Sequence, residues 1–266
     1  MALPLRAHDA SQIARVYDAM AVGDVLVYDR AACCYTHLAL LFQRQLHEIF
    51  RMHQKQIVSF TPHRKHAAQF PKSKQAGVPK SQWLYRFGPR DQLVRWFKPK
   101  HRPRWMTAEQ YAALPDSLVL RELRYKVTRK GFRTREVTLV TTLLDPEKYP
   151  AESLAEQFGE RWQIEIDFRH LKQTMKMDVL KCETVEGVLK ELAVFTLIYN
   201  LVREVMLQAA TRQRVPLHRI SFIDALRWLR QADPSEPLPR LKVIPHRPGR
   251  IEPRVVKRRP KPFPLM

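Results

Sequence analysis

The 266-residue sequence predicts an α/β protein with a β-rich insertion and a helical C-terminal part. Three observations predict this class. The first residues alternate between strand and helix patterns, as in an α/β layer. The middle of the chain carries short runs of β-branched and aromatic residues, and long helical patterns follow Pro150. The predicted parts are residues 1–52, 53–149, 150–233 and a basic, proline-rich tail, 234–266.

A large positive charge narrows the classes of function. The formal net charge is +21 and 45% of the residues are hydrophobic, so the chain is predicted to fold although its charges repel one another. Such a surplus indicates nucleic acid or an anionic membrane as the partner. The longest clean apolar run, residues 192–202, is about half of a membrane-spanning helix. The sequence therefore predicts nucleic acid and no membrane.

The cysteines and the first residues indicate a cytoplasmic protein. Cys33, Cys34 and Cys182 form neither a CxxC motif nor a disulfide framework, and the adjacent pair fits small buried residues in a reducing compartment. The first residues have no apolar core of the kind found in a signal peptide. With DNA as partner, the expected location is the cytoplasm, in association with the nucleoid.

Residues 1–52 are predicted as helix, strand, helix and strand. Apolar residues at helical spacing predict a helix over 10–20, which Gly23 ends. A short apolar run predicts a buried strand over 24–29. A helix over about 35–45 and a strand over 46–53 follow.

Asp29 is a candidate catalytic carboxylate. It ends the first predicted strand and begins a loop, the position where α/β sheets present catalytic residues. The alternative is that Asp29 caps the following helix or turn, and Asp24 competes for the same role. On the next strand, Arg51 is a possible phosphate contact.

The predicted insertion, 53–149, is basic and aromatic. Between Thr61 and Arg104 the single acidic residue is Asp91. Strands are predicted over residues 82–87, 92–97, 117–127 and 135–144. The aromatic and basic stretch 83–105 could contact DNA, with cations on phosphates and a tryptophan on an unstacked base. The alternative is that its aromatic residues form the core of the insertion while its cations face water.

A long helix is predicted over about 151–176, with others over about 184–212 and 221–232. On a helical wheel, the apolar residues of the long helix form a stripe that is predicted to be buried: Ile164, Phe168, Leu171 and Met175. Phe158, Arg161, Glu165 and Lys172 fall on one face beside that stripe, with Arg169 nearby. Ion pairing of Glu165 with Arg161 and Arg169 at i, i+4 spacing, worth a few tenths of a kcal/mol, is the alternative to a functional role.

The spacing of Phe158, Arg161, Glu165 and Lys172 resembles the Tyr-x2-Arg-x3-Glu-x6-Lys signature of bacterial insertion-sequence transposases of the IS-four type, in the DDE and RNase H-like superfamily. The surroundings are similar too. "GDVLVYDRA" resembles the strand of that family's second aspartate. "LKCETVEGVLKELAVFTLIYNLVREVM" resembles the helix that follows the signature, and the basic end of the chain resembles the family's C-terminus.

The resemblance implies an RNase H-like core, with residues 1–52 as the second half of its sheet and an insertion before the catalytic glutamate. It implies two-metal phosphoryl transfer on DNA, in which two aspartates and a glutamate hold two Mg²⁺ about 3.5–4 Å apart. Asp29 and Glu165 would then be catalytic metal ligands. Phe158, Arg161, Lys172 and Arg169 would contact DNA. The partners implied are the inverted-repeat ends and target DNA, bound by a homodimer.

Two departures from the family pattern shape the expectation. Phe158 replaces the signature tyrosine, so the hydroxyl is lost while stacking remains possible. Residues 1–28 leave no strand for a first aspartate, because Asp9 and Asp18 lie in or beside the first predicted helix. The expectation is an N-terminally truncated transposase with an incomplete core and catalytic triad, whose own activity is uncertain.

Two other classes of function remain open. A non-catalytic DNA-binding or dimerisation fragment would bind transposon ends without cutting them and could inhibit an intact transposase. A general basic nucleic-acid-binding protein would show no preference for inverted repeats over random DNA.

Overall fold

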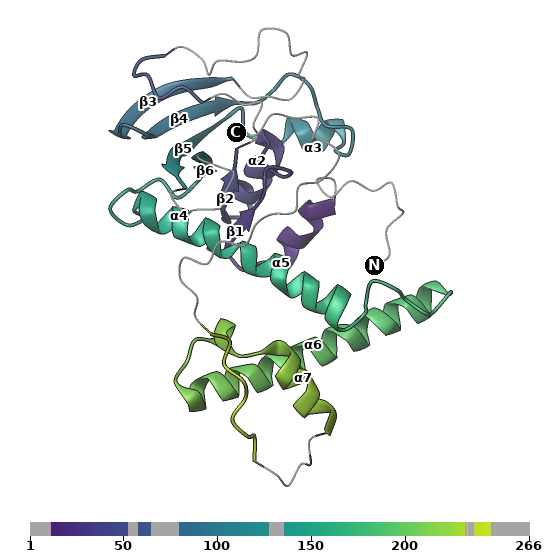
Figure 1. The fold of residues 1–266 in the computed structure, drawn as a ribbon. Helices are drawn as coiled ribbons and strands as arrows, with labels where there is room; N and C mark the ends of the chain where they lie inside the picture. The colour runs from purple at the N-terminus through teal and green to yellow at the C-terminus, as the bar shows by residue number, and fades with distance from the viewer. Residues whose placement is uncertain are drawn as a thin grey trace, which may run out of the picture. The chain divides into compact units, whose positions relative to one another are not determined.

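The computed structural model describes residues 12–52, 58–64, 80–127, 136–231, 233 and 237–245 (Figure 1). These residues form two compact units that divide between Arg161 and Trp162. We call the described residues up to Arg161 the sheet unit and those from Trp162 the helical unit. Each unit is described by itself.

The sheet unit is built on a six-stranded sheet with the order β1-β2-β6-β5-β4-β3. Its strands are β1 (Val25–Tyr28), β2 (His47–Arg51), β3 (Ser81–Gly88), β4 (Asp91–Phe97), β5 (Ser117–Lys126) and β6 (Glu136–Thr141). β1 and β2 run parallel, and the other neighbours are antiparallel. The six strands predicted from the sequence are confirmed, with ends that shift by a few residues.

The predicted insertion shares its sheet with the N-terminal strands. β6 pairs with β2, with Phe50 opposite Val140. The strands between residues 80 and 141 thus continue the layer that β1 and β2 begin. This arrangement is a mixed α/β fold in which one sheet spans both of the regions that the sequence separates as 1–52 and 53–149.

Two apolar clusters cover the two faces of the sheet. Adjacent strand residues point to opposite faces, so Phe50 joins one cluster and Ile49 the other. α2 (Tyr35–Gln43) packs on the Phe50 face, and α4 (Ala151–Glu160) packs on the Ile49 face through Leu154 and Phe158. The sheet is therefore a central layer with a helix on each side.

The sheet unit also contains three shorter helices, and local geometry explains where two of them end or begin. Of the helix predicted over 10–20, residues 10 and 11 lie outside the described residues, and the rest contains a 3-10 helix, η1 (Ile13–Ala19). α2 ends before Gln45, whose positive φ of 56° cannot continue a helix. α3 (Ala108–Ala112) begins with a capping box between Thr107 and Gln110.

The helical unit contains α5 (Trp162–Arg169), a single π-helical turn η2 (His170–Thr174), α6 (Val185–Gln213), η3 (Leu217–Arg219) and α7 (Phe222–Gln231). α6 begins at the predicted place because the Thr184 side chain accepts a hydrogen bond from the Gly187 backbone. The predicted helices over 184–212 and 221–232 are confirmed. None of the described helices has the length and apolarity that a membrane span needs. The predicted tail, 234–266, lies outside the described residues except for 237–245, where Val243 bridges to Ile220.

The helix predicted over 151–176 is divided. α4 ends at Glu160, and the backbone N–H of Arg161 donates to the Phe158 carbonyl at 3.3 Å, a tighter turn than that of an α-helix. α5 follows at once, and η2 then widens the last turn, with the Met175 N–H donating to the His170 carbonyl. The 3.6-residue period therefore does not hold along the whole segment.

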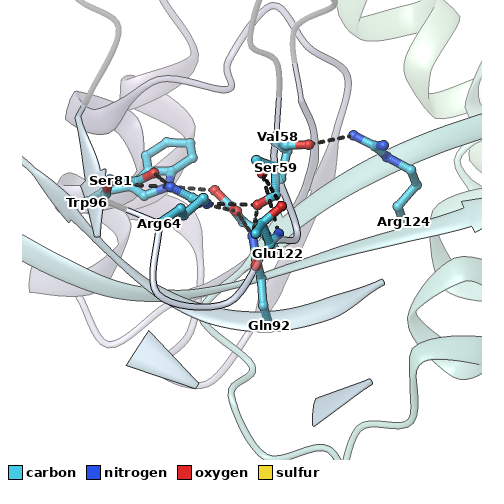
Figure 2. A network of polar contacts seen from close by, with 9 residues as sticks. Val58, Ser59, Arg64, Ser81, Gln92, Trp96, Glu122 and Arg124 are labelled. Atoms are coloured by element: carbon cyan, nitrogen blue, oxygen red, sulfur yellow. Dashed lines mark hydrogen bonds and ion pairs between the residues drawn. The ribbon is translucent and has the colours of Figure 1, made fainter. Parts of the chain in front are cut away.

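A buried polar network crosses the outer strands of the sheet (Figure 2). Glu122, on β5, is 1% exposed and accepts hydrogen bonds from Trp96 Nε1 at 2.9 Å and Gln92 Nε2 at 2.8 Å. Arg64 forms an ion pair with Glu122 at 3.4 Å. Burial raises the pKa of Glu122, and the Trp96 hydrogen bond and the Arg64 charge oppose that shift.

The same network fixes the segment 58–64 to the sheet. Arg64 donates to the Ser59 carbonyl at 2.7 Å and to Ser81 Oγ at 2.8 Å, and Arg124 donates to the Val58 carbonyl at 3.1 Å. This segment has no helix or strand of its own. Side-chain donors satisfy backbone carbonyls that regular structure would otherwise pair.

Glu48 is a second buried carboxyl group, on β2. It is fully buried, Thr142 Oγ1 donates to its Oε2 at 3.1 Å, and its Oε1 has no hydrogen-bond partner among the described residues. Burial raises the pKa of Glu48 to about 8. Glu48 is therefore largely protonated in the folded protein at neutral pH.

We expect Glu122→Ala to lower the free energy of unfolding by about 3 kcal/mol, because it leaves buried donors and the Arg64 charge without their acceptor. Glu136→Ala is the matched control on the neighbouring strand. Glu136 pairs with Arg90 at 2.6 Å, but both side chains are more than 40% exposed, so its loss should cost less than about 1 kcal/mol. Urea unfolding measures the free energy of unfolding of both variants. Equal small decreases in that free energy would contradict a stabilising network.

Glu48 should make stability depend on pH. Its pKa is higher in the folded than in the unfolded protein, so its contribution is complete below about pH 4.5 and is lost as the pH rises to about 8. The loss is on the order of 3–5 kcal/mol. In Glu48→Gln the side chain cannot ionise, so this variant should lack this part of the slope of unfolding free energy against pH. Urea unfolding at several pH values tests this, and identical slopes for both proteins would disprove it.

Candidate active site and nucleic-acid interface

The parallel pairing of β1 and β2 puts Asp29 beside Arg51. Tyr28 is opposite Phe50 in the register, and Asp29 and Arg51 are the next residues of their strands. Both side chains are half-buried. Two side chains of opposite charge thus meet at the carboxyl ends of two parallel strands, which is the edge where α/β sheets carry their sites.

Asp29 also holds the loop that follows β1. Its Oδ1 accepts a hydrogen bond from the Arg30 backbone at 2.6 Å, and its carbonyl accepts one from Ala32 at 3.3 Å. It does not cap α2, whose N-cap residue is Cys34. Asp29 therefore caps the turn through its Oδ1 atom and does not cap the following helix. Asp24, its sequence competitor, bonds instead to the Ala21 backbone at the other end of β1.

Charged groups from three elements act on the Arg51 guanidinium group. Burial lowers the pKa of Arg51, the Arg30 charge lowers it further, and the charge of Asp29 opposes these effects. Arg161, at the end of α4, also lowers the pKa of Arg51, while Tyr125 raises it. Like charges held this close favour an anion between them. We call Asp29, Arg30, Arg51, Arg161 and Tyr125 the β1–β2 edge cluster.

α4 delivers Arg161 to this cluster through Phe158. The Phe158 ring is 8% exposed and packs in the core cluster that covers the Ile49 face. The guanidinium carbon of Arg161 lies 5.7 Å from the centre of that ring. In this structure Phe158 is a core residue that supports Arg161, and its ring does not offer a free face for stacking on a base.

Glu165, Arg169 and Lys172 lie in the helical unit, on α5 and η2, and all three are exposed. The Lys172 ammonium lies 5.6 Å from the centre of the Phe168 ring. That Glu165 and Lys172 share one face stays a prediction of the helical wheel. The salt-bridge interpretation of Glu165 stays open.

The prediction that Ile164 and Phe168 are buried is wrong, since they are 47% and 52% exposed. α5 instead turns polar residues inward. Asp167 lies 3.8 Å from Arg203 on α6, and the His170 ring stacks on Phe222 at 4.2 Å. The other two residues of the predicted stripe, Leu171 and Met175, are partly buried, and Met175 packs against the core of the helical unit. Ile164 and Phe168 face outward because the ion pair of Asp167 and the ring stack of His170 fix the other side of this segment to the unit.

Four of the seven predicted site residues lie in one unit of the structure. Asp29, Arg51, Phe158 and Arg161 belong to the sheet unit, whereas Glu165 and its neighbours belong to the helical unit. Across the described ranges, three or more His, Cys, Asp or Glu side chains nowhere gather in a group that could hold a metal ion. Sequence reasoning missed Arg30, although it adjoins Asp29, and Tyr125, for which the sequence carries no signal.

The cysteines and tryptophans near the candidate site serve packing. Cys33 is buried against Met52 at 3.8 Å, and burial raises the pKa of the Cys34 thiol, which suppresses its reactivity. Trp96 is 1% exposed and bonded to Glu122, which excludes it as a platform for a base. The core interpretation of stretch 83–105 therefore holds for Trp96, while Tyr85, 58% exposed, presents a ring to solvent.

Two comparisons with known proteins bear on the family of this chain. A family model described as "Transposase DDE domain" matches residues 3–201, a range that includes Asp29 and Glu165. The chain is also 30% identical over 201 residues to "Transposase InsG for insertion sequence element IS4" of Escherichia coli (strain K12). That match covers 68% of this chain and 43% of InsG, so the chain spans less than half the length of this relative.

Proposed function

The chain belongs to the DDE transposases of the IS4 type, and we propose that it acts on insertion-sequence ends by cleaving DNA and transferring strands. The observation that carries this proposal is the β1–β2 edge cluster, in which Asp29 lies beside Arg30 and Arg51, and Arg51 is within electrostatic range of Arg161. A carboxylate beside fixed cations suits a site that must hold both a metal ion and phosphate oxygens. We propose the β1–β2 pair as part of an RNase H-like core.

The metal ligands we propose are Asp29 and Glu165, with Mg²⁺ as the ion. Their donor chemistry fits, because Mg²⁺ prefers carboxylate oxygens and keeps several waters or substrate phosphates in its shell. Asp29 uses Oδ1 for the Arg30 backbone, which leaves Oδ2 as its ligand atom. When bound, such an ion supplies activation of the attacking oxygen and stabilisation of the leaving one.

The cations of the chain position the DNA. We propose that Arg51 and Arg161 hold phosphate oxygens next to Asp29, and that Arg169 and Lys172 do so beside Glu165. Phe158 acts through Arg161, since its buried ring supports the guanidinium group. These contacts fix the register of a DNA end without reading its sequence.

The proposed partners are the inverted-repeat ends and target DNA, bound by a homodimer that pairs two ends. Because the substrate is chromosomal, we place the protein on the nucleoid in the cytoplasm. A second candidate function is a DNA-binding or dimerisation fragment that does not cut. The net charge of +21 supports DNA binding by itself, whether or not the chain also cuts the DNA.

We expect Glu165→Gln to lower Mg²⁺-dependent nicking of labelled inverted-repeat DNA by at least about 100-fold, because the amide is a poor metal ligand. Binding of the same DNA should change less than about twofold. Glu160→Gln, an exposed glutamate five residues earlier, is the matched control and should retain nicking. Gel assays of nicking and of binding measure both effects.

The outcome distinguishes the two candidate functions. Wild-type protein that shifts inverted-repeat DNA but never nicks it would support the non-cutting fragment and contradict the enzyme. Nicking that survives Glu165→Gln would remove Glu165 from the metal site. Equal affinity for inverted repeats and random DNA would indicate a general nucleic-acid-binding protein instead.

Neutralising Arg161 and Lys172 together should weaken DNA binding and reduce its salt dependence. Each lost phosphate contact lowers the slope of log affinity against log salt by about 0.9, so the double Gln variant should lose a slope of about 2. Arg227 and Arg230, exposed on α7, give a charge-matched control. Fluorescence anisotropy over a salt series measures the slopes, and equal losses in both variants would show that only net charge matters.

A further inference from the structure

α6 is apolar around most of its circumference over residues 192–202, "LAVFTLIYNLV". A helix of this kind is normally buried on all sides. One side of α6 meets that expectation, because Val202, Val205 and Met206 pack in the core cluster of the helical unit with α7. The other side carries apolar residues that the unit does not cover.

The uncovered side forms a narrow seam. Val194, Leu197 and Leu201 are 54%, 59% and 46% exposed. Their spacing of three and four residues is that of a coiled-coil seam, in which such side chains meet a second helix. Lys190 and Glu204 continue the same spacing at the two ends of the apolar part. Both charged residues are exposed, and Lys190 forms a surface pair with Glu186.

The order of charges along the seam fits a second copy of α6 in the antiparallel direction. When the two helices are centred near Leu197, Lys190 of one copy comes within one helical turn of Glu204 of the other, at both ends. The apolar residues then face one another between the two charge pairs. Parallel pairing would instead bring Lys190 beside Lys190 and Glu204 beside Glu204, which is repulsive.

We propose that the seam of Lys190, Val194, Leu197, Leu201 and Glu204 is the interface of a two-fold homodimer, formed by antiparallel packing of two α6 helices. A two-fold interface uses the same patch on both subunits, so it needs a patch that complements itself. The seam meets this need, because its apolar residues lie at its centre and its two ends carry opposite charges. This proposal gives an interface for the homodimer of the proposed function, and it rests on that proposed function.

Sedimentation equilibrium of the full chain without DNA tests the interface. At about 50 μM the wild type should sediment at twice the chain mass of 31.4 kDa. Leu197→Lys should raise the dissociation constant at least about 30-fold, because a central apolar contact becomes a buried charge. Leu207→Lys is the matched control. Leu207 is 49% exposed on the same helix but off the seam, and its change should be below about threefold.

Charge reversal tests the antiparallel direction. Lys190→Glu and Glu204→Lys should each weaken the dimer several-fold, and the double reversal should restore it. Circular dichroism checks that each variant keeps its helix content. A wild-type monomer, a dimer that survives Leu197→Lys, or equal effects of Leu197→Lys and Leu207→Lys would overturn the proposal. Because no DNA is present, loss of nicking and loss of this interface are measured separately.

Discussion

The register of β1 against β2 is the constraint on which the candidate site depends. Tyr28 lies opposite Phe50, so the residues that follow, Asp29 and Arg51, emerge side by side. β6 fixes β2 from its other side, and α4 then packs on the same layer and brings Arg161. A shift of one residue would turn Arg51 to the other face of the sheet and separate it from the carboxylate.

The electrostatics of the edge cluster explain why a carboxylate suits a strongly basic protein. Burial and the charges of Arg30 and Arg161 lower the pKa of Arg51, and the charge of Asp29 opposes this shift. The mutual repulsion of these arginines is relieved by the carboxylate and would be relieved further by phosphate. Binding an anion therefore stabilises an arrangement that the free protein holds at an electrostatic cost. The buried Phe158 ring keeps Arg161 in that arrangement.

Local signals in the sequence predicted the elements well, whereas their long-range pairing was not predictable. Apolar runs located the strands, and Thr184 located the start of α6. The pairing of β2 with β6 joins Phe50 to Val140, residues far apart in the chain, and no local pattern carries that information. The wheel over 151–176 failed for Ile164 and Phe168 because the contacts of Asp167 with Arg203 and of His170 with Phe222 decide which side of the segment faces the helical unit. Asp29 and Arg51 were found because strand ends are readable, but Tyr125 reaches the cluster only through sheet pairing.

The exposed apolar residues of α6 connect folding to assembly. In the core of the helical unit, α7 and the chain around Leu241 pack against one side of α6. Burying the seam would add stabilisation of about 25 cal/mol for each Å² of apolar surface removed from water. The helical unit by itself leaves this contribution unused and exposes a surface that favours non-specific association. Lys190 and Glu204 at the ends of the seam restrict which surfaces can cover it, because a partner must offer the opposite order of charges. A second copy of the same helix, reversed in direction, offers that order.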